Sequence, residues 1–415
     1  MRDINKKLKS IFMVIVLMAM ITGCSKGEDS VTVNGTLANK TDAAGEQPTI
    51  EHTTQEMTTE EPTTEPFVPT EINIKMIGDI LMHDGVTSSG LLEDGTYNYD
   101  HIFANVRDEI QSADIAIVNQ EVILGGKELG LSGYPCFNGP YEMGDALVKA
   151  GFNVVLHATN HALDKGATGI DNCLTFWKTN YPDIAVLGVA QTKEESENIY
   201  VYEQDGIKIA ILNYTYGTNG IALPTGREYM VNMLDTDRIV SDLKRAKEMS
   251  DFVIVCPHWG PEYKHEAWNE PGSIYDETNW AKLMADNGAD LIIAAHPHVI
   301  QQVEWIEGEN GNKTLCYYSL GNFVSNQDKA PRMLGAMADI TISNTEDGQI
   351  YIKDYGVIPL VTHKLFGRQA ITTYKLSDYT EELAAENRIK NEDDIFSVEY
   401  CKELCRQVFG DLYKE

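Results

Sequence analysis

Acidic, amide and imidazole side chains recur in this 415-residue chain, each after a short apolar run. They are Asp79, Glu121, Asn160, His161, Asp164, His258, His296 and His298. Any one of them alone is better explained as a turn, a helix cap or a hydrogen-bonded core residue than as a ligand. Together they offer oxygen and imidazole ligands without a thiolate, which suits Mn, Fe or Zn better than a structural zinc–cysteine site. His296 and His298, in the pattern His-x-His, could reach two adjacent divalent ions, and a carboxylate between the ions could bridge them.

The apolar runs that precede these residues alternate with helical patterns. Strands are expected at 72–77, 115–118, 153–157, 207–212, 252–256 and 291–295, and helices at 102–111, 143–150, 167–177, 236–249 and 279–287. Asp205-Gly206 predicts a hairpin between 200–202 and 207–211. After residue 299 the pattern becomes β-rich, with strands at 299–305, 314–318, 336–342 and 350–360. We expect an α/β fold with mixed sheets, whose strand ends carry the ligand-type residues.

Six motifs occur in a fixed order. They are Gly78-Asp79, Asn119-x-Glu121, Asn160-His161-x-x-Asp164-x-Gly166, His258-Trp259-Gly260-x-Glu262-Tyr263, His296-Pro297-His298-Val299, and Tyr-Ser-Leu-Gly-Asn-Phe at 318–323. Over about residues 70–365, this series resembles the bacterial CapA, or poly-γ-glutamate capsule synthesis, family, which is similar to the calcineurin-like metallophosphoesterases. The resemblance implies a four-layer αββα sandwich of mixed sheets with a dinuclear metal centre at one edge.

The resemblance also implies a role for each ligand-type residue. Asp79 and His298 would bind one metal, Asn160, His258 and His296 would bind the second, and Glu121 would bridge both. His161 would face the substrate as a general acid or electrostatic clamp, oriented by Asp164. Two ions would acidify a bridging water and neutralise an anionic transition state, so the implied enzyme is a metal-dependent hydrolase.

The chain departs from the phosphoesterase pattern at three positions. His83 follows Asp79 by four residues instead of two, Glu121 replaces the usual Asp, and Ala295 replaces the Gly before His-x-His. His83 is therefore a candidate metal or substrate ligand. Trp259, Tyr263 and Asn322 are candidate substrate-binding residues, with core packing as the alternative interpretation.

The N-terminus has the pattern of an export signal. Basic residues precede the apolar segment 11–21, which is too short to span a bilayer comfortably, and small residues then precede Cys24. This order resembles a bacterial lipobox and implies lipidation of Cys24; an ordinary signal peptide or an uncleaved anchor is the alternative. We therefore expect a signal peptide (1–23), a disordered Thr/Glu/Pro-rich tether (24–70), a CapA-like domain (71–370) and a C-terminal helical tail (371–415).

The charge balance limits the partners. The chain has 33 basic and 63 acidic residues, a formal charge of −30, which argues against nucleic-acid binding. An anionic substrate would need a local source of positive charge, and a pair of metal ions would supply it.

The leading hypothesis is a lipoprotein of the cell membrane that faces outside the cytoplasm and acts in capsule or poly-γ-glutamate biosynthesis, export or attachment. Its partners would be an anionic polymer or a substrate containing phosphate or amide groups, and membrane polymer-synthase subunits. The alternatives are a non-catalytic scaffold of a membrane polymer synthase and a general extracellular metallophosphoesterase.

Overall fold

The computed structural model describes residues 67–309, 311–389 and 396–413. The predicted signal peptide, Cys24 and nearly all of the predicted tether lie outside these ranges. Within the described ranges, no helix is both long enough and apolar enough to cross a membrane.

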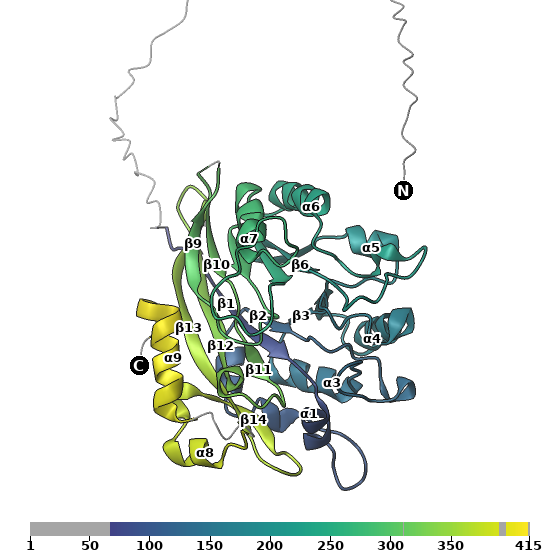
Figure 1. The fold of residues 1–415 in the computed structure, drawn as a ribbon. Helices are drawn as coiled ribbons and strands as arrows, with labels where there is room; N and C mark the ends of the chain where they lie inside the picture. The colour runs from purple at the N-terminus through teal and green to yellow at the C-terminus, as the bar shows by residue number, and fades with distance from the viewer. Residues whose placement is uncertain (1–66, 310, 390–395, 414–415) are drawn as a thin grey trace, which may run out of the picture. The chain divides into compact units, whose positions relative to one another are not determined.

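Two mixed sheets form the centre of the fold (Figure 1). The eight-stranded sheet has the order β14–β13–β12–β1–β2–β3–β4, with β11 paired to β1. Its strands are β1 (Glu71–Ile80), β2 (Ile115–Asn119), β3 (Val154–Leu156), β4 (Ala185–Leu187), β11 (Asn322–Val324), β12 (Leu334–Asn344), β13 (Ile350–Lys364) and β14 (Ile371–Lys375). The six-stranded sheet has the order β5–β6–β7–β8–β10–β9. Its strands are β5 (Tyr200–Gln204), β6 (Ile207–Thr215), β7 (Phe252–His258), β8 (Leu291–Ile293), β9 (Val303–Glu307) and β10 (Lys313–Tyr317).

Helices cover the outer face of each sheet. The eight-stranded sheet packs against α1 (Asp84–Ser89), α2 (Arg107–Gln111), α3 (Tyr141–Ala150) and α4 (Gly166–Asn180). The six-stranded sheet packs against α6 (Thr236–Met249) and α7 (Glu277–Asp286). The short helix α5 (Lys193–Glu197) precedes β5. This arrangement confirms the expected α/β fold class, a four-layer αββα sandwich of mixed sheets.

Alternation of side chains along the strands explains the layering. In β6, Ile209 and Ile211 join the core between the sheets, whereas Ala210 and Leu212 pack toward the helices. Both faces of these strands are buried, so they appear in the sequence as nearly continuous apolar runs.

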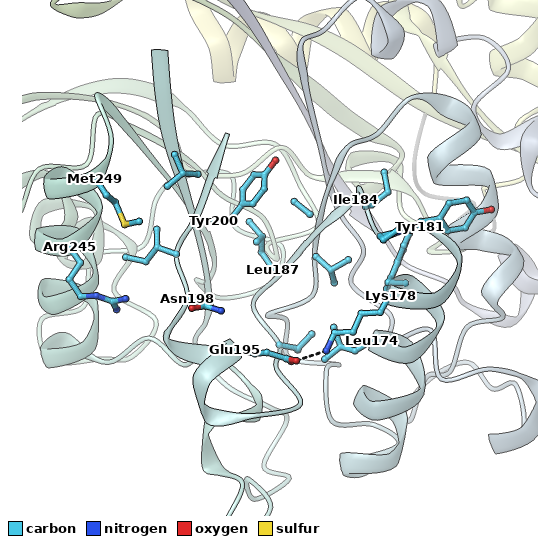
Figure 2. Close-up of a pocket in the computed structure, with 17 residues that line it drawn as sticks. Leu174, Lys178, Tyr181, Ile184, Leu187, Glu195, Asn198, Tyr200, Arg245 and Met249 are labelled. Atoms are coloured by element: carbon cyan, nitrogen blue, oxygen red, sulfur yellow. Dashed lines mark hydrogen bonds and ion pairs between the residues drawn. The ribbon is translucent and has the colours of Figure 1, made fainter. Parts of the chain in front are cut away.

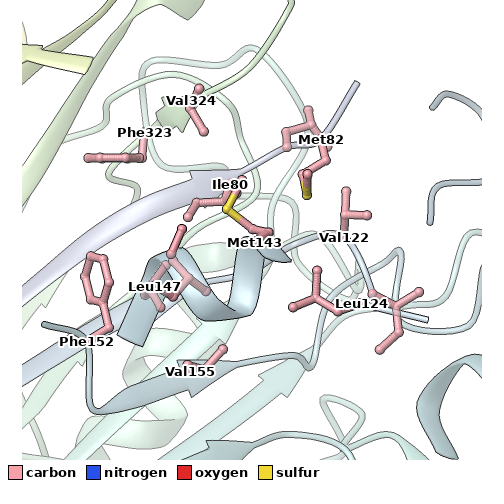
Figure 3. Packing of buried hydrophobic residues seen from close by; sticks show 14 of the residues in the cluster. Ile80, Met82, Val122, Leu124, Met143, Leu147, Phe152, Val155, Phe323 and Val324 are labelled. Atoms are coloured by element: carbon pink, nitrogen blue, oxygen red, sulfur yellow. The ribbon is translucent and has the colours of Figure 1, made fainter. Parts of the chain in front are cut away.

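The core beneath α3 shows the same principle on the other sheet. Figure 3 shows Met143 and Leu147 of α3 packed beside Ile80, Phe152 and Val155. Because α3 presents one apolar face and the strand residues point toward it, this layer needs no buried polar contact.

The predicted hairpin is confirmed. β5 and β6 pair in antiparallel fashion, and the turn residues Asp205 and Gly206 have φ values of 51° and 83°. Positive φ at both turn positions is the geometry that Asp-Gly favours.

The C-terminal segment differs from the expected helical tail. Its first residues form β14, which pairs with β13, so residues 371–375 belong to the eight-stranded sheet. Helices follow only at α8 (Glu381–Glu386) and α9 (Val398–Phe409). Cys401, Cys405 and Phe409 of α9 are buried in the core between the sheets, and Figure 1 shows α9 alongside β13. This segment is thus an integral part of the fold.

Candidate metal centre

The candidate centre lies at the carboxyl ends of five strands, β1, β2, β3, β7 and β8. Asp79 of β1 lies in register with Asn119 of β2, and Glu121 follows β2 by two residues. From the other sheet, His258 ends β7 and pairs with Ala295, which directly precedes His296. Because β1 runs parallel to β2 and β7 runs parallel to β8, their carboxyl ends meet on the same side of each sheet. The packed sheets bring the two sets of residues together.

Glu121 lies in the middle of this cluster. Its carboxylate is fully buried, and neither oxygen has a hydrogen-bond partner. Its Oε1 is 3.8 Å from Nε2 of His258, 3.8 Å from Nε2 of His298 and 4.0 Å from Nε2 of His161. Burial raises the pKa of Glu121 well above its usual value, and the negative charge of Asp79 adds to this effect. A buried carboxylate of this kind is costly unless a cation compensates it.

Two of the surrounding imidazoles, those of His258 and His296, are suited to donate lone pairs. Burial, together with the positive charge that neighbouring histidines can carry, lowers the pKa of both His258 and His296 well below the usual value. They are therefore neutral, and Nδ1 of the buried His296 has no hydrogen-bond partner. Burial also disfavours charge on His298, but Glu121 and Asp79 outweigh it and raise its pKa to about 9.

These observations fit a divalent cation. Glu121, His296 and His298 each offer a ligand atom within 4.8 Å of the others. The unpartnered oxygens of Glu121 and the unpartnered nitrogen of His296 are the atoms that a cation would satisfy. One carboxylate and two imidazoles form a donor set typical of Zn, Mn or Fe sites.

Asp79, Asn160 and His258 lie around this triad. Asp79 accepts a hydrogen bond from Asn119 (2.7 Å) and lies 3.0 Å from Nδ1 of His298. Nε2 of His258 lies 2.9 Å from Oδ1 of Asn160. The structure thus brings together all six residues that the sequence proposed as metal ligands, with Asp79 next to His298 and Asn160 next to His258.

The His-x-His turn has an unusual backbone. His296 and His298 have φ values of 105° and 59°, in the region that side-chain-bearing residues rarely adopt. Strain of this kind persists only where the surrounding structure enforces it, and it often occurs at functional sites. Here it accompanies the placement of two imidazoles with ring centroids 5.7 Å apart.

His161 is held in a defined orientation at the edge of the cluster. Its Nδ1 lies 2.7 Å from Oδ2 of Asp164, an oxygen that also accepts from the backbone N–H of Phe137. The ring of Phe137 packs against that of His161, with centroids 4.6 Å apart. Asn219 contacts the imidazole as well, at 3.3 Å from Nδ1. The expected pairing of His161 with Asp164 is therefore present in the structure.

His83 lies near the centre without joining the triad. Its Nδ1 accepts a hydrogen bond from the backbone N–H of Asn326 (3.4 Å), and its ring contacts Phe137. Burial, and to a smaller extent His298, lowers its pKa to about 4. His83 is therefore not part of the ligand set that the geometry defines.

Two of the three residues predicted to bind substrate have other surroundings. Trp259 is fully buried in the core behind the six-stranded sheet and donates to the carbonyl of Tyr318, so it does not line the site. Asn322 is also fully buried, and its Oδ1 lies 3.1 Å from Nδ1 of His298, which it orients. Tyr263 alone is exposed, at 39%, with its ring 6.0 Å from that of His298.

Sequence reasoning assigned no role to several residues that contact the centre, although Asn119 stands in one of the six motifs. Asn119 bridges Asp79 and His258, at 2.7 Å and 3.3 Å. The ring of Tyr216 packs against that of His296 in a tilted contact (4.7 Å between centroids), and Tyr216, like Asn219, follows the end of β6. The rule of polar residues at parallel strand ends could have found these three. Arg332, in a 3₁₀ turn, carried no comparable signal.

A separate cavity of about 610 Å³ lies between the edge strands β4 and β5. Figure 2 shows its walls, which include Leu187, Tyr200 and Met249, and an ion pair between Lys178 and Glu195 (2.6 Å). None of the residues of the candidate centre lines this cavity.

Comparison with known proteins gives the family. Capsule biosynthesis protein CapA of Bacillus anthracis is 28% identical over 271 residues, which cover 62% of this chain and 60% of that protein. PGA biosynthesis protein CapA of Bacillus subtilis (strain 168) is 32% identical over 179 residues, covering 42% of this chain and 43% of that protein. The match thus spans less than two thirds of the length of either relative.

Among solved structures, the NAD nucleotidase of Haemophilus influenzae aligns with a TM-score of 0.45 and 14% identity, covering 84% of this chain and 65% of that chain. A putative 5′-nucleotidase from Staphylococcus aureus aligns with a TM-score of 0.44 and 14% identity, covering 81% and 58%. The model of the family described as bacterial capsule synthesis protein PGA_cap matches residues 73–327, which is more than half of the chain and contains every residue of the candidate centre. The chain therefore belongs to the PGA_cap family of bacterial capsule synthesis proteins.

Proposed function

We propose that this chain is a metal-dependent hydrolase of capsule or poly-γ-glutamate biosynthesis, anchored at the outer side of the cell membrane. The observation that carries the proposal is Glu121, a fully buried carboxylate with two unpartnered oxygens among three imidazole nitrogens. A protein gains nothing in stability from such an arrangement, so a bound cation and its chemistry are the better explanation.

The ligand assignment follows from the distances. Glu121, His296 and His298 would hold one divalent ion, and Asn160 with His258 would contribute to a second beside it. Such ions, when bound, lower the pKa of a coordinated water and stabilise developing negative charge. Asp79 and Asn322 would keep the imidazole of His298 fixed through its Nδ1.

His161 would manage the proton of the leaving group. Asp164 accepts from Nδ1, so Nε2 is the ring position that faces the cluster; it lies 4.0 Å from Oε1 of Glu121 and 3.4 Å from Nδ2 of Asn219. In its protonated imidazolium form, a ring fixed in this way carries a hydrogen on both nitrogens and can donate the proton of Nε2 to a leaving oxygen or nitrogen. The ring of Phe137 makes a T-shaped contact with the imidazole and helps to hold it in place.

The test is metal analysis combined with hydrolysis assays on the full chain. We expect bound divalent metal in the purified protein, its loss in His296→Ala, and hydrolysis of a γ-glutamyl oligomer or a phosphodiester by the wild type alone. Absence of metal from the wild type would overturn the enzymatic proposal. If His296→Ala supports capsule assembly as well as the wild type does, a scaffold for a membrane polymer synthase is the better description.

The location is a separate part of the proposal. The basic N-terminus, the apolar segment 11–21 and Cys24 support export and lipid attachment. Replacement of Cys24 by Ser should move the protein from the membrane fraction to the medium or the periplasm, as immunoblotting of cell fractions would reveal. Membrane retention of Cys24→Ser would contradict the lipid anchor.

A further inference from the structure

Arg332 differs from most arginines of this acidic chain. Five others form ion pairs: Arg227 with Asp171, Arg238 and Arg245 with Asp242, Arg368 with Glu93, and Arg406 with Glu399. Among the described residues, no carboxylate lies within ion-pair distance of Arg332. With 63 acidic residues in the chain, an arginine beside the centre without an acidic partner is available to a ligand.

Arg332 is connected to the centre by two routes. Its guanidinium lies over the ring of Tyr263, 3.5 Å from the centroid, and that ring lies 6.0 Å from His298. Its backbone carbonyl accepts from Nδ2 of Asn322 (3.1 Å), and Oδ1 of the same amide lies 3.1 Å from Nδ1 of His298. Both ends of the residue are therefore fixed relative to a proposed metal ligand.

The stacked position defines what Arg332 can bind. A guanidinium so close above a ring lies nearly parallel to it, so the N–H groups in its own plane do not point at the ring. These groups form a planar fork that matches the two oxygens of a carboxylate. Tyr263 is itself held by the backbone hydrogen bond to Pro297 (2.7 Å) and by Gln327 at its hydroxyl (3.4 Å).

The carboxylate of Glu262 limits how much negative charge a ligand bound by Arg332 can carry. The side chain of Glu262 is exposed and directly precedes Tyr263, so its negative charge lies close to the ring over which Arg332 is held. A carboxylate, with one negative charge, can be balanced by the guanidinium of Arg332. A phosphate dianion has a second negative charge, which the carboxylate of Glu262 would repel.

We propose that Arg332, held over Tyr263, is a specificity-determining residue that binds a carboxylate of the substrate beside the metal centre. The choice of a glutamyl substrate rests on the proposed function. The carboxylate would belong to a residue next to the bond that is cleaved, and it would fix the polymer in register with His161 and the metal ligands.

The experiment is direct binding to the full chain in the presence of a metal chelator, measured by isothermal titration calorimetry. The probe is tri-γ-glutamate, compared with its methyl ester and with inorganic phosphate. We expect tri-γ-glutamate to bind wild type at least about tenfold more tightly than Arg332→Met, the equivalent of about 1.4 kcal/mol. Arg332→Lys should recover only part of the difference, because an ammonium lacks the planar fork.

Two variants serve as controls. Arg388→Met removes an arginine that also lies over an aromatic ring, that of Phe366 (5.2 Å), and it should leave binding unchanged. Glu262→Gln should tighten binding, since it removes a negative charge near the same place. Thermal melting of each variant establishes that it is folded.

Equal affinity of wild type and Arg332→Met for tri-γ-glutamate, or no binding to wild type, would overturn the inference. So would Arg332-dependent binding of phosphate without binding of tri-γ-glutamate. Because these measurements use metal-free protein, they are independent of the metal and hydrolysis assays. A failure of the proposed enzymatic function is thereby distinguished from a failure of the carboxylate site.

Discussion

The candidate centre and the cavity between β4 and β5 differ in how their polar groups are satisfied. In the centre, Glu121 and His296 are buried and carry atoms without hydrogen-bond partners. Around the cavity, Lys178 pairs with Glu195 at 2.6 Å, and Arg245 pairs with Asp242 at 3.1 Å. The cavity has the volume of a ligand site, about 610 Å³, but its charges already have partners. Unpartnered buried groups, more than volume, indicate where function resides.

The comparison also explains why the two regions arise. The cavity lies where the edge strands of two sheets meet imperfectly, and apolar side chains such as Leu187 and Tyr200 line it. The centre lies at strand ends, where loops can present polar groups from both sheets to one another. Incomplete packing produces the cavity, whereas the candidate centre requires a specific and energetically costly set of residues.

The largest effect should follow from Glu121→Gln. The amide is isosteric but uncharged, so we expect loss of bound metal and of hydrolysis, as measured by elemental analysis and a turnover assay. The matched control in the cavity wall is Glu195→Gln. Full metal retention in Glu121→Gln would place the function elsewhere.

His161→Asn should have the next largest effect. We expect the hydrolysis rate to fall about 10²- to 10⁴-fold, because the proton donor at Nε2 is lost, while the metal content remains that of wild type. Asp164→Asn should reduce the rate less, since the imidazole stays but its orientation is weakened. A variant His161→Asn with wild-type turnover would remove this residue from the mechanism.

Glu277 provides a buried carboxyl outside both regions, and it should give the protein a pH dependence. Burial raises its pKa to about 8, although Trp268 and Gln301 donate hydrogen bonds to it. Folding thus favours the protonated carboxyl, so its contribution to stability is full below the pKa of the unfolded chain and is lost as pH rises through 8.

We therefore expect the free energy of unfolding to fall between pH 6 and pH 9 by about 1–3 kcal/mol more in wild type than in Glu277→Gln, on the scale of an unsatisfied buried group. Denaturant titration in the presence of chelator measures the difference. Parallel pH profiles for the two proteins would contradict the assignment.

The smallest effect should come from Lys178→Met in the cavity wall. The ion pair with Glu195 is half exposed, so its loss should change stability by less than about 1 kcal/mol. Metal content and hydrolysis should stay at the wild-type level. A large loss of activity in Lys178→Met would show that the cavity takes part in function and would remove the contrast drawn above.

Much of the architecture could be predicted because long apolar runs specify it. The expected strand at 252–256 and the expected helix at 236–249 correspond to β7 (Phe252–His258) and α6 (Thr236–Met249). The short strands β4 and β11 were missed, whereas β3 and β8, which are equally short, lie within longer apolar runs and were predicted. β14 was assigned to a helical tail because its pairing with β13 is a long-range contact that local pattern does not report.

The candidate site shows the same division at the level of single residues. His258 and Trp259 are adjacent in one motif, yet the imidazole faces the centre and the indole faces the core behind the sheet. Alternation along a strand separates neighbours onto opposite faces, and which face is the site depends on what packs there. The motif could therefore be identified from the sequence, but which of its residues face the site could not.

By itself, the sequence determined the types of ligand, their order along the chain and their position after apolar strands, because these are local properties. It also determined the family. Only the tertiary structure decided that Glu121 would be buried without partners, that His296 and His298 would adopt positive φ, and that Arg332 would lie over Tyr263. Each of these depends on two sheets and a distant turn meeting at one edge, which is settled by the packing of the whole core.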